Sequence, residues 1–161
     1  MMISAAMELT ELLEHEGISY ERLPHRHTES AAEEAEALGV DPHEVAKTVV
    51  LLSGRRYVRA VIPASNRLDV HKLRELLDVR EHPHLAHEEE LEAAYPTFEL
   101  GAVPPVGGPA GDRVVVDRRL ADRDTIVIEA GTHEESVRLG ATDLLILAHA
   151  AIGDLCLADA A

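Results

Sequence analysis

The sequence Glu44-Val45-Ala46-Lys47-Thr48-Val49-Val50-Leu51-Leu52 decides how the rest of the chain is interpreted. Residues 49–52 form an unbroken apolar run that is half β-branched, which predicts a short strand buried on both faces. Lys47 lies at the entrance to this strand. A lysine there either extends to the rim of the sheet or stays inside to hold an anionic group, and both interpretations remain open.

The composition is that of a folded protein. The chain has 161 residues, of which 46% are hydrophobic, so we expect a single domain over 1–161 with a substantial core. No apolar run approaches the roughly 20 residues of a membrane span, and the first residues lack a signal-peptide pattern. The single cysteine, Cys156, excludes an intrachain disulfide and is interpreted as a packed small side chain. We therefore expect a cytoplasmic protein without a membrane partner.

The formal net charge of −15 disfavours non-specific nucleic-acid binding, so a DNA partner is not expected. The charge is uneven, because residues 47–80 contain eight basic and three acidic side chains and carry +5, whereas the remainder carries −20. This segment is therefore the place where an anionic partner could dock. A solvated basic face explains it equally well.

Apolar spacing and stop signals predict helices that occupy 5–13, 28–38, 69–77, 87–94 and a final segment from 142 to 152. The expected N-caps are Thr28, Asp69 and Thr142. Strands are expected at 18–23, 49–52, 57–62, 114–116, 125–129 and 137–139. A charged turn is expected between the strands at 114–116 and 125–129, with residues 82–84 as a loop. Residues 130–133 are expected to break the strand at 125–129, and the tail after Gly153 to fray.

Residues 100–111 form the only stretch rich in glycine and proline, Gly101-Ala102-Val103-Pro104-Pro105-Val106-Gly107-Gly108-Pro109. Glycines at both ends of a stiff loop let backbone N–H groups approach a ligand closely. A plain turn between strands would have the same composition, and the sequence does not separate the two.

Histidines occur at metal-like spacing in two places, one formed by His82, His84 and His87 and the other by His25 and His27. Neither an HExxH motif nor a cysteine partner accompanies them, so solvated histidines without a metal are expected. The sequence also lacks a GxSxG elbow, a P-loop and a GxGxxG motif, and no pair of carboxylates stands out from the acidic background. Covalent hydrolysis and nucleotide-triphosphate chemistry are therefore disfavoured, and no cofactor is expected.

In the order and spacing of its motifs, the chain resembles the YbaK/prolyl-tRNA synthetase-associated editing-domain family, which includes free-standing aminoacyl-tRNA deacylases. The resemblance covers about residues 5–155. The matching motifs are Thr28 with Ala31 and Ala32, Leu38-Gly39, Val45-Ala46-Lys47-Thr48, Ala60-Val61-Ile62-Pro63, Leu68-Asp69-Val70-His71-Lys72-Leu73, Gly101-Ala102-Val103-Pro104-Pro105-Val106-Gly107, and Ala130-Gly131-Thr132-His133 with Val137.

The resemblance implies an α+β fold with a mixed, partly barrel-like β-sheet surrounded by helices. It also implies hydrolysis of the ester that joins a mischarged amino acid to tRNA. The family's lysine falls on Lys47, its GxxxPxG loop on Gly101, Pro105 and Gly107, and its Gly-Ser-His turn on Gly131-Thr132-His133. Catalytic roles are thus expected for Lys47, Gly101 and His133, and substrate contacts for Thr28, Ala31, Pro105, Gly107, Gly131, Thr132 and Ser136.

These residues suggest a mechanism that needs no metal. Backbone amides of the 101–107 loop would stabilise the developing oxyanion, and the Lys47 ammonium, facing them across a cavity, would hold the terminal adenosine of the tRNA acceptor end. The alanine face of the helix at 28–38 would admit small side chains such as those of alanine, serine or cysteine. Two alternatives remain: a catalytically silent domain of the same fold that binds an aminoacyl-tRNA or a synthetase, and a metal hydrolase using the histidines.

Overall fold

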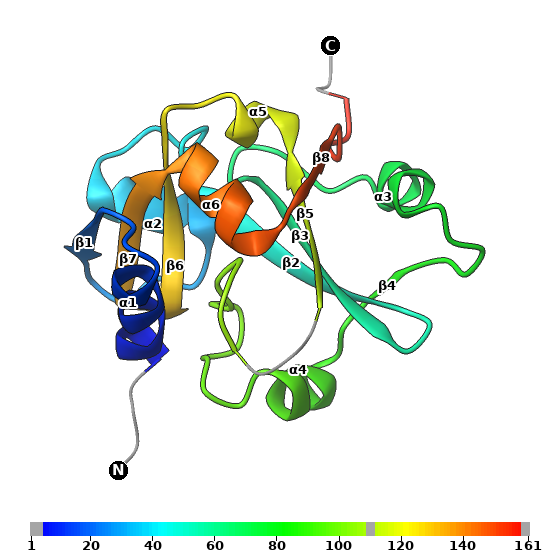
Figure 1. The fold of residues 1–161 in the computed structure, drawn as a ribbon, viewed down its shortest axis with the longest axis horizontal. Coiled ribbons are helices and arrows are strands. Elements are labelled where there is room, and N and C mark those ends of the chain that lie inside the picture. The colour runs from blue at the N-terminus through cyan, green and yellow to red at the C-terminus, as the bar shows by residue number, and fades with distance from the viewer. Residues whose placement is uncertain (1–4, 109–111, 159–161) are drawn as a thin grey trace.

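The computed structural model of the chain describes residues 5–108 and 112–158, and the end of the predicted loop at 109–111 lies outside this range. The strands form two sheets (Figure 1). The smaller sheet is antiparallel and contains, in spatial order, β1 (Tyr20–Pro24), β7 (Glu135–Gly140) and β6 (Thr125–Thr132). The larger sheet is mixed and contains β4 (His84–Leu85), β2 (Ala46–Ser53), β3 (Arg56–Pro63), β5 (Arg113–Asp117) and β8 (Ala151–Gly153).

The two sheets meet where β2 begins. Val45 and Val127 form an isolated parallel bridge, and the Val127 amide donates to the Glu44 carbonyl at 3.0 Å. In the described residues the sheets stay separate and do not close into a barrel. The predicted α+β class with a mixed sheet is confirmed, and the segment 44–52 lies at its centre.

The predicted hairpin in the larger sheet is also confirmed. β2 and β3 pair antiparallel over their whole length, with Lys47 opposite Ile62. Leu51 and Ile62 are fully buried, because β2 and β3 lie in the interior of this sheet between β4 and β5. Pro63 ends β3, as expected for a residue that cannot donate to a ladder.

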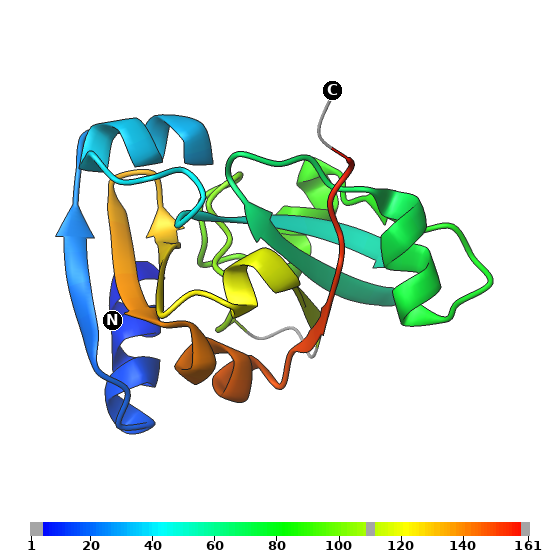
Figure 2. The same cartoon turned by 90° about the horizontal axis from the view of Figure 1, so that it is seen from above.

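Six helices cover the sheets in the described part of the chain (Figure 2). They are α1 (Ala5–His15), α2 (Ala31–Leu38), α3 (Val70–Leu77), α4 (Glu88–Ala94), α5 (Arg118–Ala121) and α6 (Ala141–Ala148). α1 and α6 share one apolar cluster with the smaller sheet, to which they contribute Leu9, Leu13 and Leu144. α3 packs on the larger sheet through Leu73 and Leu77, and α2 packs on Val45 and Val127.

Helix caps differ from the prediction at two of three positions. Asp69 caps α3 as predicted. α2 instead begins after Ser30, whose extended backbone lets its hydroxyl accept from the Glu33 amide at 3.2 Å. α6 follows β7 directly with Gly140 at the N-cap, so Thr142 already lies inside the first turn.

Four further predictions about local structure were wrong. Residues 118–121 form α5 instead of a turn, because the Asp117 carboxylate accepts from the Arg119 amide. β6 continues to Thr132 because a bulge with Gly131 at φ +93° keeps it paired with β7. Residues 84–85 pair with β2, and Ile152 belongs to β8 instead of the last helix.

The tail after Gly153 is also ordered where it is described, contrary to the prediction. Leu155 and Cys156 are fully buried, and the Leu155 carbonyl accepts from the Asp69 amide at 2.7 Å. Burial, followed by a contact with the Asp117 carboxylate, raises the pKa of the Cys156 thiol to about 12. This cysteine is therefore held as a neutral thiol, as its interpretation as a packed side chain requires. Over the described ranges, no helix is both long and apolar enough to cross a membrane.

Candidate functional site

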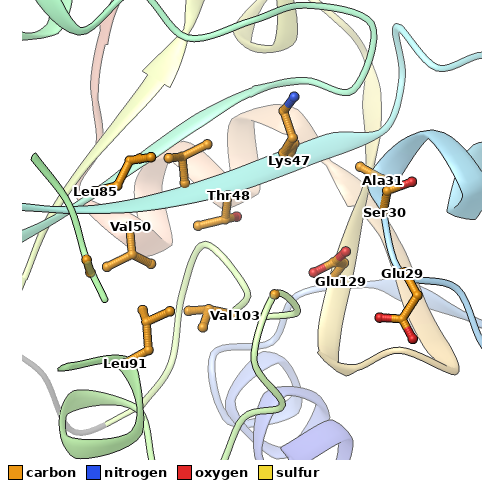
Figure 3. A pocket seen from close by; sticks show the side chains of 13 residues that line it. Glu29, Ser30, Ala31, Lys47, Thr48, Val50, Leu85, Leu91, Val103 and Glu129 are labelled. Carbon is orange, nitrogen blue, oxygen red and sulfur yellow. The ribbon is translucent and has the colours of Figure 1, made fainter. Parts of the chain in front are cut away.

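A pocket of about 340 Å³ lies between β2, the start of α2 and the glycine- and proline-rich loop (Figure 3). It has two ends of different polarity. The polar end is lined by Glu29, Ser30, Thr48 and Glu129, and the apolar end by Val50, Leu85, Leu91 and Val103. Ala31, Lys47, Val49, Ala86 and Gly101 complete the lining.

Three predicted site residues, Lys47, Ala31 and Gly101, come together in this pocket. Ala31 arrives there because Ser30 caps α2 and turns the first residue of the helix towards β2. The small methyl side chain of Ala31 leaves space in the pocket that a larger side chain would fill. Thr48 and Val50 point into the pocket from β2, since alternate residues of a strand face the same side.

Lys47 lines the pocket, but its ammonium does not face the loop. The Nζ atom donates to the Asn66 carbonyl at 3.1 Å, and Figure 3 shows it on the opposite side of β2 from Thr48 and Val103. The prediction that this ammonium faces the loop amides is therefore wrong, because Lys47 and Thr48 alternate across the strand. Burial and the nearby Arg67 guanidinium lower the pKa of Lys47. Within the described residues neither cation has an ion pair, so together they form a positive site beside the pocket.

Arg59 fixes the loop from behind. It is 1% exposed, and its guanidinium donates to the Pro104 carbonyl at 2.7 Å and to the Gly107 carbonyl at 2.5 Å. Its third bond goes to Asp112 at 2.5 Å. Arg59 is one of the eight basic residues of the segment 47–80, where an anionic partner was expected to dock. Its burial excludes that role and makes it a structural support of the loop, whereas Arg55 is exposed in the β2–β3 turn.

Gly101 lines the pocket from the loop, together with Val103. Its φ of +81° belongs to the left-handed region that favours glycine, and a Cβ there would lie 3.4 Å from Cε1 of His133. Within the described part of the chain, the Gly101 and Val103 amides make no hydrogen bond, while the Ala102 amide donates to the Glu99 carbonyl at 3.0 Å. Among these residues, two backbone donors are therefore free at the pocket wall.

His133 lies behind the loop and does not line the pocket. Its Nε2 is 2.6 Å from the Leu100 carbonyl oxygen, and its backbone amide donates to the Glu99 carboxylate at 3.0 Å. Since a carbonyl only accepts, Nε2 carries the proton in this contact. The side chain is thereby occupied in holding the loop and is not directed at a water in the pocket. The Thr28 amide donates to the His133 carbonyl at 3.0 Å, so Thr28 supports the turn and is itself buried.

The remaining predicted contact residues lie outside this pocket. Pro105 and Gly107 line a different cavity beside α1 and α6. Gly131 and Thr132 form the bulged end of β6, where the Gly131 carbonyl accepts from the Glu99 amide at 2.9 Å. Ser136 is fully buried, so it does not contact a ligand in this pocket directly.

Ser136 instead belongs to a buried polar network that sequence analysis missed. Its hydroxyl shares hydrogen bonds with the Glu34 carboxyl and with Nε2 of His25, the latter at 2.9 Å. Burial raises the pKa of Glu34 to about 7, although the Ser136 hydrogen bond acts in the opposite direction. Burial and the nearby Glu34 carboxyl also raise the pKa of Glu129 well above its usual range. Two carboxyl groups with raised pKa values thus lie at and behind the polar end of the pocket.

The sequence partly indicated that Glu34 and Glu129 are unusual. Glu129 ends the apolar run Thr125-Ile126-Val127-Ile128, and Glu34 lies on the alanine face of α2. A carboxylate at a position that the pattern assigns to the core is unusual. The two histidine groups do not develop into a site: among the described side chains, no three His, Cys, Asp or Glu residues are arranged to hold a metal ion.

The fold is that of a class of small α+β domains for which solved structures exist. A protein proposed to be a trans-editing enzyme for prolyl-tRNA synthetase superimposes with a TM-score of 0.84 at 25% identity, over 98% of this chain and all of that one. A hypothetical protein gives a TM-score of 0.84 at 26% identity over 93% of this chain and 99% of the other. A scaffold used for computational epitope grafting shares the fold, with a TM-score of 0.84 at 23% identity over 98% of this chain and all of the scaffold.

The sequence model of the aminoacyl-tRNA editing domain matches residues 25–147, so the chain belongs to this family. The match begins at His25 and extends through β7 into α6, and it includes every residue that lines the pocket. No curated protein matches the sequence.

Proposed function

We propose that the chain is a trans-editing deacylase that hydrolyses the ester between a small, mischarged amino acid and its tRNA. The observation that carries this proposal is the pocket, which is lined by Ala31, Thr48, Gly101 and Val103. The amides of the last two make no hydrogen bond with the described residues. Family membership and the similarity to a proposed trans-editing enzyme support it.

The two ends of the pocket suggest how the substrate lies. The aminoacyl group occupies the polar end, where Ala31 limits its size to that of alanine, serine or cysteine. The terminal nucleoside extends along the apolar end towards Leu85, which is 59% exposed and offers an apolar surface at the pocket mouth. The ester carbonyl then lies beside Gly101, and this arrangement brings it within reach of the backbone donors.

Hydrolysis in this arrangement depends on water as the nucleophile and on stabilisation of the oxyanion by the Gly101 and Val103 amides. One preorganised donor of this kind contributes about 10²–10³ in rate. His133 and Arg59 act as positioning residues, because both hold the carbonyls of the same loop from behind. No protein side chain is assigned as the general base, and groups of the substrate itself are available for that step.

The tRNA acceptor end docks, in this proposal, through the positive site formed by Lys47 and Arg67. A phosphate placed there would relieve the repulsion between two adjacent cations. Docking confined to one small site reconciles tRNA binding with a net charge of −15. By analogy with the similar structure, a tRNA that prolyl-tRNA synthetase mischarges is the first substrate to test, with that synthetase as a partner.

A second candidate function is a catalytically silent domain that binds aminoacyl-tRNA or a synthetase. The specific observation in its favour is that the Lys47 ammonium and the His133 ring both bond to backbone carbonyls instead of facing the pocket. Deacylation assays with misacylated tRNAs separate the two candidates, because a silent domain binds the tRNA and leaves the rate of ester hydrolysis at that of buffer.

A further inference from the structure

The polar end of the pocket contains a carboxyl group without a partner in the described protein. Glu129 lines the pocket, and its carboxyl makes no hydrogen bond or ion pair with the described residues. Figure 3 shows this carboxyl reaching from β6 into the hollow below Thr48. Among the described residues of the lining, Lys47 is the only cation, and its ammonium lies on the other side of β2. A cation bound in the pocket would therefore meet the Glu129 carboxyl without competition from a described protein cation.

Glu34 is a second carboxyl group near Glu129, and it brings no positive charge with it. It is 1% exposed, and its Oε1 atom has no hydrogen-bond partner among the described residues. Glu34 contacts Ser136, which is the cross-strand neighbour of Glu129 in the β6–β7 ladder, so the two glutamates lie on the same side of this sheet. Two adjacent carboxyl groups disfavour each other's ionised form, and a ligand cation bound beside them would favour that form.

We propose that Glu129, supported by Glu34, binds the α-ammonium group of the aminoacyl ester. This inference rests on the proposed function, because it takes the ligand of the pocket to be an aminoacyl group. The α-ammonium is the one positive charge that every aminoacyl ester carries close to its carbonyl. In a pocket that Ala31 and Gly101 also line, Glu129 selects an amino acid over a hydroxy acid or an N-blocked acyl group. Glu129 is thus a specificity-determining residue and not a base.

Two hydrolysis-resistant ligands test this assignment by binding alone. One is adenosine with L-alanine attached through a 3′-amide, and the other is the same amide with lactic acid, which replaces the α-amine by a hydroxyl. Wild-type protein is expected to bind the alanyl compound about 10–100-fold more tightly, as expected for a hydrogen bond to a charged group. Glu129→Gln is expected to bind both compounds with similar affinity, because the neutral amide no longer favours the ammonium.

Glu92→Gln is the matched control, because Glu92 is exposed on α4 and the substitution removes the same charge. This variant should keep the wild-type preference, and thermal unfolding of all three proteins reports on their folding. Glu129→Asp keeps the charge and should retain part of the preference. This partial rescue is not expected if the Glu129 side chain only fills space.

The inference is overturned if wild-type protein shows no preference, if neither ligand binds, or if folded Glu129→Gln retains the full preference. Hydrolysis of alanyl-tRNA, measured beside the binding assay, separates this failure from that of the proposed function. Hydrolysis without a preference refutes the subsite and keeps the deacylase. A Glu129-dependent preference without hydrolysis supports the subsite and refutes the deacylase.

Discussion

Arg59 donates a 2.7 Å hydrogen bond to the carbonyl of Pro104, which ties the interior strand β3 to the loop that carries the free amides of the pocket. The guanidinium also lies 4.8 Å from the centre of the Tyr95 ring, so its position is fixed on several sides. The buried Arg59 guanidinium therefore holds this loop in place, in addition to the prolines that stiffen it.

Substitution of Arg59 should damage both stability and activity. Arg59→Ala leaves the buried Asp112 carboxylate without its charged partner, with only the Tyr95 hydroxyl still donating to it. Loss of one partner of a buried ion pair typically lowers the unfolding free energy by about 3–5 kcal/mol. Arg59→Lys keeps the charge but cannot reach both loop carbonyls, so it should lower kcat more than it raises KM. Denaturant unfolding and deacylation kinetics measure these effects. The exposed Arg55→Ala is the control, and Arg59 variants that behave like it would contradict the proposed support of the loop.

Gly101→Ala should lose activity beyond its effect on stability. An alanine at φ +81° is strained by about 1–2 kcal/mol, and its Cβ would lie 3.4 Å from His133. If the loop amides stabilise the oxyanion, their displacement should lower kcat by about 10²–10³. Gly39→Ala is a matched control, because Gly39 has φ +66° and no atom near the added Cβ. Equal kcat values for the two variants would argue against catalysis by the loop.

The salt dependence of tRNA binding should report on the positive site. Lys47→Ala and Arg67→Ala should each weaken binding and reduce the slope of log K against log salt by about 0.7 for every phosphate that the variant no longer neutralises. Arg118→Ala, an exposed arginine on α5, should leave the slope unchanged. Binding titrations at several salt concentrations provide the measurement. Identical slopes for all variants would place the tRNA elsewhere.

The stability of the protein should fall with rising pH through Glu34. Its pKa in the folded protein is about 7, above the ordinary value of 4.5, so the folded state holds this proton more tightly than the unfolded chain does. The resulting stabilisation is complete below pH 4.5 and is lost as the pH rises through about 7. A shift of this size corresponds to about 3 kcal/mol.

Urea unfolding of wild type and Glu34→Gln between pH 4.5 and pH 8 tests this linkage. The unfolding free energy of wild type should decrease relative to that of the variant over this range, because glutamine does not titrate. Glu36→Gln changes an exposed residue of the same helix and should follow wild type. Parallel pH profiles for wild type and Glu34→Gln would show that Glu34 titrates normally.

The sequence predicted the fold better than the site. The apolar run 49–52, the β2–β3 hairpin and the Asp69 cap were predictable because they depend on local patterns. Ser30 was missed as a cap because Thr28 has an equally suitable side chain. Gly140 was missed because a glycine at the N-cap has no side chain to signal a helix start. α5 was missed because a single helical turn has too few residues for a periodic pattern.

For the site, the motifs identified Lys47 and Gly101, which both line the pocket. They did not indicate on which side of β2 the Lys47 side chain lies. Strand alternation decides this direction, and the register only becomes known with the structure. Arg59 was counted with the basic segment 47–80 because sequence does not show that Asp112 and the loop carbonyls surround it. Glu34 and Glu129 were missed because they come together across α2 and β6, and the many other acidic residues hide them in the composition.

Single-turnover hydrolysis of misacylated tRNAs tests the central claim most directly. Purified protein, with and without excess chelator, would be mixed with tRNA charged with alanine, serine, cysteine or the larger phenylalanine. The account predicts that at least one small aminoacyl ester is hydrolysed faster than in buffer, that the chelator has no effect, and that the phenylalanyl ester is spared. Hydrolysis of every ester at the buffer rate, while the tRNA remains bound, would contradict it and identify a silent binding domain.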